Sequence, residues 1–222
     1  MNIPSFNNLS DQLVRIFYVT LRDGEQAAGY SMSRSQKRRV AQALAELGVD
    51  IIEAGFAQAS DQDFASIRQI AHEVHGPIIC SLARCQNGDI ETTARALEGA
   101  ERSRIHIFIA TSPLHREFKL AMSKQQVIDN AVAGVIHARR YFEDVEFSAE
   151  DAMRTEPDYL AEVLTAVIAA GAKTVNIPDT VGYTSPAEMF ERISFIKNHV
   201  RNIDDAVISV HCHNDLGMAV AN

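Results

Sequence analysis

Seven short runs of β-branched and apolar residues recur along the chain, and a stretch with helical spacing follows each one. The runs occupy residues 16–21, 50–56, 77–83, 104–110, 144–148, 174–177 and 207–213. Their repeat of roughly 30 residues is the length of one βα unit. Strict alternation of strand and helix predicts parallel strands that are covered on both faces.

Turn residues mark the ends of the expected helices. The segment 33–47 places apolar residues on one face, and Gly48 follows it as a C-terminal stop. Ser185 and Pro186 supply an N-cap and a first-turn proline for a later segment. The comparable segments are 122–141, 156–170 and 186–200. Because no Gly/Ser-rich linker interrupts this pattern, we expect one domain over residues 1–222.

Polar residues at the ends of the strand-like runs favour a closed TIM (β/α)₈ barrel over an open doubly wound sheet. A barrel gathers its chemistry at the C-terminal ends of many strands, whereas an open sheet uses mainly its switch point. No GxGxxG motif follows the first run, which disfavours dinucleotide binding. The polar residues at the run ends are Arg22, Asp23, Glu53, Arg84, Thr111, Ser112, Ser148, Glu150, Asp179, Thr180, His211 and His213.

The barrel count is one strand short, with seven of eight βα units. The seventh run is complete, and residues 217–222 would begin the next helix. We therefore expect a barrel that lacks its last strand and helix, as a truncated form of a longer enzyme. Strands one and seven would then stand roughly 10 Å apart across the missing strand, within joint reach of one ion.

Two histidines at the end of the seventh run indicate a metal site. His211 and His213 are two residues apart on a strand, so both imidazoles point the same way. Asp23, at the end of the first run, supplies a carboxylate from another strand. The alternatives are histidines satisfied by backbone carbonyls and a turn role for Asp23. Asn214 and Asp215 follow directly and could orient the imidazoles.

A carboxylate within an apolar run also needs explanation. Glu53 lies in the run 50–56, and its burial without a partner would be costly. Pairing with Arg22 inside the barrel would remove that cost, and Arg22 could also stabilise a developing negative oxygen. His106 either points into the lumen or is a satisfied core histidine. The remaining histidines, His72, His75, His115, His137 and His199, are predicted to be surface residues.

Charge and composition exclude several classes of protein. A net charge of -8 disfavours nucleic-acid and anionic-membrane surfaces, and no apolar stretch reaches the roughly 18 residues of a membrane span. The basic cluster 34–39 is interpreted as a solvated helix face. Residues 1–11 lack the features of a signal peptide, and the three cysteines fit no disulfide framework. We expect a cytoplasmic protein.

Five stretches together resemble the catalytic barrel of the 2-isopropylmalate synthases, within the superfamily of metal-dependent Claisen-type barrels. The resemblance spans about residues 16–222, and the segment NIPDTVGYT points to the isopropylmalate branch. The stretches are TLRDGEQ at 20–26, FIATSP at 108–113, VEFSAED at 145–151, NIPDTVGYT at 176–184 and SVHCHNDLG at 209–217.

The resemblance implies roles for individual residues. Asp23, His211 and His213 would hold a divalent metal, Mn or Mg with Zn possible, together with an asparagine beyond Asn222. It implies that Arg22 polarises the reacting oxygen and that Glu53 supports Arg22. Potassium is implied as an activator. The implied substrate contacts, besides Arg22, are Leu82, His106, Glu150, Pro178 and Thr180, with Glu150 also catalytic.

The implied reaction condenses acetyl-CoA with 2-oxoisovalerate to 2-isopropylmalate in leucine biosynthesis. The full-length protein is expected to be a homodimer, and this chain alone is expected to be inactive. A homocitrate or citramalate synthase of the same superfamily is an alternative that differs only in the pocket for the oxo acid. A non-catalytic barrel module is the alternative from another class.

Overall fold

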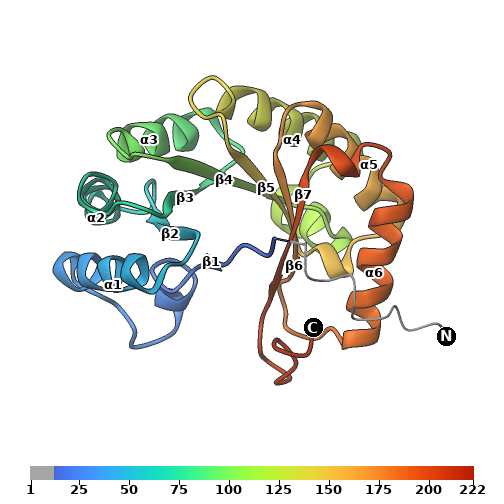
Figure 1. Cartoon of the computed structure of the whole chain (residues 1–222). Helices are drawn as coiled ribbons and strands as arrows, with labels where there is room; N and C mark the ends of the chain where they lie inside the picture. The colour runs from blue at the N-terminus through green and yellow to red at the C-terminus, as the bar shows by residue number, and fades with distance from the viewer. Residues whose placement is uncertain (1–12) are drawn as a thin grey trace.

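Seven parallel strands form one sheet in sequence order in the computed structural model of the chain, which describes residues 13–222 (Figure 1). The segment 1–11, considered above for a signal peptide, lies outside the described residues. Each strand is hydrogen-bonded in parallel to the next. The strands are β1 (Phe17–Tyr18), β2 (Ile51–Phe56), β3 (Ile78–Arg84), β4 (Ser103–Ala110), β5 (Val145–Glu150), β6 (Thr174–Asp179) and β7 (Val207–Cys212).

Helices connect the strands, and the predicted end signals are confirmed. Gly48 ends its helix in a left-handed conformation with φ of 84°, and Ser185 forms a capping box with Glu188. None of the helices within residues 13–222 combines the length and apolar character needed to cross a bilayer. The α-helices are α1 (Arg34–Leu47), α2 (Asp61–Glu73), α3 (Asn87–Leu97), α4 (Lys124–Ala138), α5 (Pro157–Ala169) and α6 (Pro186–His199), with short helical turns η2 (Gly24–Gln26), η3 (His115–Leu120), η4 (Ala152–Arg154) and η5 (Ile203–Asp205).

The sheet curls so that its two edge strands approach each other. β1 pairs only with β2, and β7 pairs only with β6, within the described residues. Nevertheless a side chain beyond the end of β1, Asp23, lies 3.2 Å from His211 in β7. The helices lie on the convex side in Figure 1. The predicted barrel architecture, with seven of its eight strands, is confirmed.

Alternate strand residues serve two different environments. Ile105, Ile107 and Phe147 are fully buried in the apolar core that includes the helices. His106 and Ser148, one position away, face the concave interior, because their hydrogen bonds join strands across it. The interior of the curled sheet is therefore polar, and its polar layer leads toward the strand ends.

The first strand is much shorter than the predicted run 16–21. Only Phe17 and Tyr18 pair with β2, after which the chain turns. Three successive backbone N–H groups, those of residues 22–24, all donate to the carbonyl oxygen of Val19. This turn removes Leu21 from the strand but leaves its side chain fully buried. Apolar content predicted burial there correctly and strand pairing wrongly.

The basic cluster 34–39 is not a uniformly solvated face, contrary to the prediction. Lys37 is 2% exposed, and its Nζ lies 2.5 Å from Glu25 and 2.8 Å from Asp63. A buried ammonium requires such partners because an unpaired charge inside a protein is strongly disfavoured. Lys37 thus joins η2 and α2 to α1.

Two of the five histidines predicted to be at the surface are not. His137 is 9% exposed, with its Nε2 3.2 Å from Glu91 Oε1. His115 is partly buried, and its Nδ1 lies 3.2 Å from Asp151 Oδ2. Both have carboxylate partners on other elements, which helical spacing alone does not reveal. His72, His75 and His199 are exposed as predicted.

We expect Gly134→Ala in α4 to destabilise the protein although alanine is the better helix former. A Cβ at Gly134 would lie 2.9 Å from Cys85 Cβ and 3.0 Å from Cys85 Sγ. Overpacking costs about 1–3 kcal/mol, which outweighs the roughly 1 kcal/mol of helix propensity. Urea denaturation would show a lower free energy of unfolding.

The matched control is Gly88→Ala in α3, where an added Cβ meets nothing within 4 Å. There propensity acts alone, so the free energy of unfolding should rise by a few tenths to about 1 kcal/mol. A stabilised Gly134→Ala variant would contradict the close approach of α4 to the chain after β3.

Candidate active site

Three side chains from the two edges of the sheet converge at one point. Asp23 Oδ2 lies 3.2 Å from His211 Nε2 and 3.2 Å from His213 Nε2. One donor atom from each residue lies within 4.8 Å of the others. The hydrogen bond with His211 lowers the pKa of the Asp23 carboxyl well below its usual range, and Arg22 adds to this effect. The structure thus brings together the three residues that were predicted as metal ligands.

The hydrogen bonding of His213 indicates that this group suits a cation. His213 Nδ1 lies 2.6 Å from the carbonyl oxygen of Thr180, so Nδ1 must carry the proton. A neutral ring then directs its Nε2 lone pair at the Asp23 carboxylate. In that form a cation between these two acceptors, which lie 3.2 Å apart, would bind both. Metal-binding histidines commonly donate their other N–H to a carbonyl in this way, so the residues present fit a divalent metal.

Asn214 and Asp215 do not orient the imidazoles, contrary to the prediction. Asn214 Oδ1 accepts from the backbone N–H of Ala219. Asp215 packs against the loop after β6, where a Cβ at Gly182 would meet its Oδ2 at 2.3 Å. The carbonyl of Thr180 takes the orienting role instead, because it lies at the end of the neighbouring strand.

A chain of buried hydrogen bonds runs beneath the three ligands. Arg22 Nε donates to Glu53 Oε2 at 2.5 Å, and His106 Nδ1 lies 2.7 Å from Glu53 Oε1. Ser148 Oγ lies 2.6 Å from His106 Nε2 and accepts from Asn176 Nδ2 at 2.6 Å. These contacts confirm the predicted pairing of Glu53 with Arg22. His106 belongs to the polar interior rather than to the apolar core.

Glu53 carries the charge of this network. Its side chain has no exposed surface, and burial opposes its ionisation. The charges and hydrogen bonds of Arg22 and His106 nevertheless hold the pKa of the Glu53 carboxyl below its usual value. For Arg22, burial likewise opposes the charged form, but Glu53 raises the pKa of the guanidinium overall. The pair is therefore ionised and fixed.

A cavity of about 310 Å³ opens over these residues. Nine of the ten predicted site residues line it, and the tenth, Glu53, lies directly beneath through its contacts with Arg22 and His106. The predicted residues in its wall are Arg22, Asp23, Leu82, His106, Glu150, Pro178, Thr180, His211 and His213. The turn after β1 and the ends of β3 to β7 thus meet here, but besides Glu53 four of the polar residues at the predicted run ends do not line the cavity: Arg84, Thr111, Ser112 and Asp179.

Five further residues line the cavity and were not predicted as site residues: Gln26, Phe108, Lys119, Ser148 and Asn176. Ser148 and Asn176 stand two positions before Glu150 and Pro178 on their strands, so the period of two could have identified them. Lys119 lies in η3, outside the strands, so the spacing of residues along the strands could not identify it.

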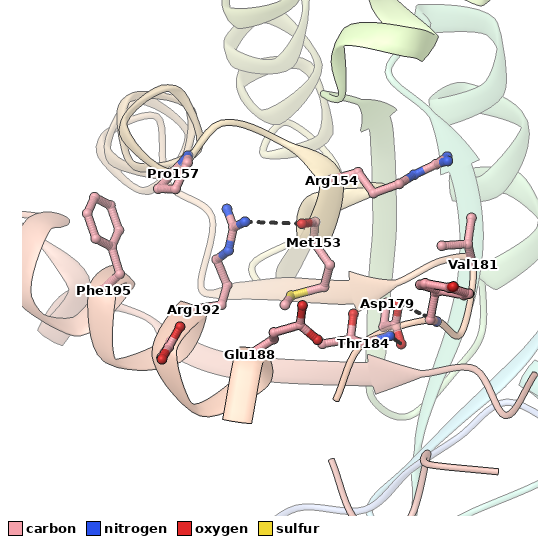
Figure 2. A pocket seen from close by; sticks show the side chains of 11 residues that line it. Met153, Arg154, Pro157, Asp179, Val181, Thr184, Glu188, Arg192 and Phe195 are labelled. Carbon is pink, nitrogen blue, oxygen red and sulfur yellow. Dashed lines mark hydrogen bonds between the residues drawn. The ribbon is translucent and has the colours of Figure 1, made fainter. Parts of the chain in front are cut away.

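A larger cavity, of about 620 Å³, lies between η4 and α6 (Figure 2). Arg192 crosses it to donate to the carbonyl oxygens of Met153 at 3.1 Å and Thr155 at 2.8 Å. Asp179 is buried there and accepts from the backbone N–H groups of residues 183 and 184. These polar groups hold loops, and none of the three candidate metal ligands lines this cavity. Chemistry, rather than size, favours the smaller cavity as the active site.

We expect Glu53→Gln to destabilise the protein by about 3–5 kcal/mol at pH 7, because it leaves Arg22 buried without its carboxylate. The folded-state pKa of Glu53 is depressed from 4.5, so its stabilisation is complete above that value. The difference between wild type and variant should shrink as the pH falls from about 4.5 through the folded-state pKa. Urea denaturation at a series of pH values measures both effects.

Glu73→Gln is the control, since Glu73 forms an exposed pair with Arg38 at 3.2 Å. This variant should leave the free energy of unfolding nearly unchanged. An equal loss in both variants, or a Glu53→Gln loss that persists undiminished in acid, would argue against a buried charged Glu53.

Comparison with known proteins identifies the family of this chain. The family model described as HMGL-like matches residues 13–222. The 2-isopropylmalate synthase of Rhodopirellula baltica is 55% identical over 219 residues, which cover 99% of this chain and 42% of that protein. The 2-isopropylmalate synthase of Methylacidiphilum infernorum is 57% identical over 208 residues, which cover 93% and 41%. The chain thus spans about two fifths of the length of these relatives.

Solved structures share the fold at low sequence identity. The HMG-CoA lyase of Bacillus subtilis superposes with a TM-score of 0.78 at 17% identity, covering 94% of this chain and 71% of that one. The carboxyl transferase domain of Rhizobium etli pyruvate carboxylase, solved with pyruvate, gives 0.71 at 14% identity, covering 96% and 37%. The family match over all described residues, together with the shared fold, shows that the chain belongs to the HMGL-like family.

Proposed function

We propose that this chain is the catalytic barrel of a 2-isopropylmalate synthase, which condenses acetyl-CoA with 2-oxoisovalerate in leucine biosynthesis. The observation that carries the proposal is the convergence of Asp23, His211 and His213 beside Arg22 in one cavity. The identity of 52–57% to curated 2-isopropylmalate synthases supports the choice of reaction.

Asp23, His211 and His213 would hold the divalent metal on which the HMGL-like superfamily depends. Imidazole nitrogens suit Zn, whereas a carboxylate and water suit Mn and Mg, so this mixed ligand set is compatible with each of the three metals. We propose Mn as the working metal. When bound, the metal would supply Lewis-acid polarisation of the 2-oxo acid and a template for its orientation.

Arg22 is the fixed cation next to the reacting oxygen. Its Nε is held by Glu53, and its Nη1 donates to Asp23 Oδ1 at 3.0 Å. A guanidinium has five N–H donors, so three remain available toward the cavity. Donors that are already in place stabilise a developing oxyanion without reorganisation, which is the usual source of large rate enhancements.

The remaining wall residues fit a small branched oxo acid. Leu82 and Pro178 offer apolar surface to the isopropyl group. The Thr180 hydroxyl oxygen accepts from the backbone N–H of Asp151 at 3.0 Å, which leaves its own O–H free for the substrate carboxylate. Glu150 is the carboxylate that could take a proton from the methyl group of acetyl-CoA. The resulting carbanion would attack the ketone carbon, the alkoxide so formed would take up a proton, and water would then cleave the thioester to release the carboxylate and CoA.

Other parts of the proposal come from the resemblance and from the three cysteines, which fit no disulfide framework. We propose that potassium activates the enzyme, that the full-length protein is a homodimer and that it is located in the cytoplasm. The additional asparagine ligand beyond Asn222 is part of the same proposal. Each concerns the whole protein rather than the cavity.

We expect the full-length protein to prefer 2-oxoisovalerate over pyruvate and 2-oxoglutarate by at least about tenfold in kcat/KM, since one or two methylenes in an apolar pocket give about 10–200-fold discrimination. Thiol release from acetyl-CoA measures this. Preference for 2-oxoglutarate would instead indicate a homocitrate synthase, and preference for pyruvate a citramalate synthase.

We expect His211→Ala to weaken Mn binding by at least about tenfold, because it removes one of three converging ligands. Isothermal titration with Mn measures the affinity. His75→Ala, an exposed histidine 3.8 Å from Glu101, is the control and should bind Mn as the wild type does. Unchanged affinity in His211→Ala would favour a non-catalytic module that retains only the fold.

A further inference from the structure

A π-helix, η3, follows β4 and contributes to the cavity wall. The N–H of Ala121 bonds to the carbonyl of Arg116, five residues earlier, and Ala121 then adopts a left-handed conformation with φ of 52°. Both features are uncommon for ordinary residues, and π-helical turns occur often at functional sites. The π-helical conformation of η3 therefore ends directly after Leu120, at the left-handed Ala121.

η3 is anchored to the scaffold rather than free to move. Arg116 is 8% exposed, and it donates to the carbonyl oxygen of Thr111 at 2.5 Å. Its guanidinium also binds both carboxylate oxygens of Glu156, at 2.9 and 2.8 Å, and lies over the Tyr159 ring at 4.7 Å. Bidentate pairs of this kind fix direction as well as distance. The start of η3 is thus held against α5.

The far end of η3 carries Lys119 into the cavity wall. Lys119 Nζ lies 2.7 Å from Glu150 Oε1 and 2.9 Å from Glu150 Oε2. Within residues 13–222, no other side chain bonds this carboxylate. Both residues line the cavity that contains Arg22. Without Lys119, the Glu150 carboxylate would be free to rotate into solvent.

We propose that Lys119 is a positioning residue, which holds the Glu150 carboxylate at one orientation toward the reacting groups. This inference rests on the proposed function, since it assigns Lys119 a role through the catalytic part given to Glu150. A lysine that acts through Glu150 lowers turnover when it is lost, but it leaves ground-state binding of the oxo acid nearly intact.

The test uses the full-length protein with acetyl-CoA and 2-oxoisovalerate. Lys119→Met should lower kcat by about tenfold or more, with KM for 2-oxoisovalerate changed less than about twofold. Lys119→Arg should recover most of the loss, because a guanidinium can bind both carboxylate oxygens. Lys197→Met is the matched control, since Lys197 is an exposed lysine in α6 that lies outside the cavity wall and away from η3. Its kcat should stay within about twofold of wild type.

A double-mutant cycle identifies the route of the effect. In a Glu150→Gln background, Lys119→Met should cause no further loss of kcat. Losses that multiply, or a full kcat in Lys119→Met, would overturn the inference.

Carbon-13 NMR of glutamate-labelled protein separates this inference from the proposed function. The Glu150 carboxylate signal, assigned by its disappearance in Glu150→Gln, should shift in Lys119→Met and stay in place in Lys197→Met. An unmoved signal refutes the positioning role whatever the reaction. Wild-type protein with no condensation activity on any oxo acid, but with the expected shift, refutes the proposed function alone.

Discussion

A single buried carboxylate, that of Glu53, is the constraint on which the interior of the barrel depends. It has no exposed surface, so its charge must be met inside the protein, and Arg22 and His106 meet it from either side. His106 is hydrogen-bonded in turn to Ser148, which accepts a hydrogen bond from Asn176. Five elements, from the turn after β1 to β6, thus contribute to one hydrogen-bonded set. Loss of any member would leave a buried polar group without its partner.

The same constraint explains why β1 can be so short. Strand pairing with β2 extends over only two residues, so backbone hydrogen bonds alone hold the first strand weakly. The buried Leu21 and the Arg22–Glu53 pair add side-chain attachments just beyond it. Asp23 is therefore presented from a turn, held by the carbonyl of Val19, rather than from a strand. A residue in a turn can direct its side chain across the gap between the two edge strands toward β7. A residue paired within β1 could not do so.

Sequence periodicity predicted features that are set within a single strand or helix. It failed for side chains whose burial depends on a partner in a second element. The alternation of runs predicted the barrel, and the period of two placed His211 and His213 on one face. The apolar surroundings of Glu53 predicted an internal partner, and Arg22 was the cation available. Lys37 and His137 were assigned to the surface because their carboxylate partners lie 26 and 46 residues away in the sequence. Lys119 could not be predicted, because a π-helix has no clear signature in sequence.

The direction of the hydrogen bonds shows how the buried network serves the cavity. Asn176 Nδ2 donates to Ser148 Oγ, and the same hydroxyl is hydrogen-bonded to His106 Nε2, so Ser148 in β5 links β4 to β6. His106 Nδ1 lies 2.7 Å from Glu53 Oε1, and an ionised carboxylate can only accept, so Nδ1 carries the proton of this hydrogen bond. The Glu53 carboxylate therefore accepts from Arg22 through one oxygen and from His106 through the other, so both of its oxygens are satisfied inside the protein. Because Arg22 commits Nε to Glu53 and one Nη1 hydrogen to Asp23, its remaining donors are left to the cavity that it lines.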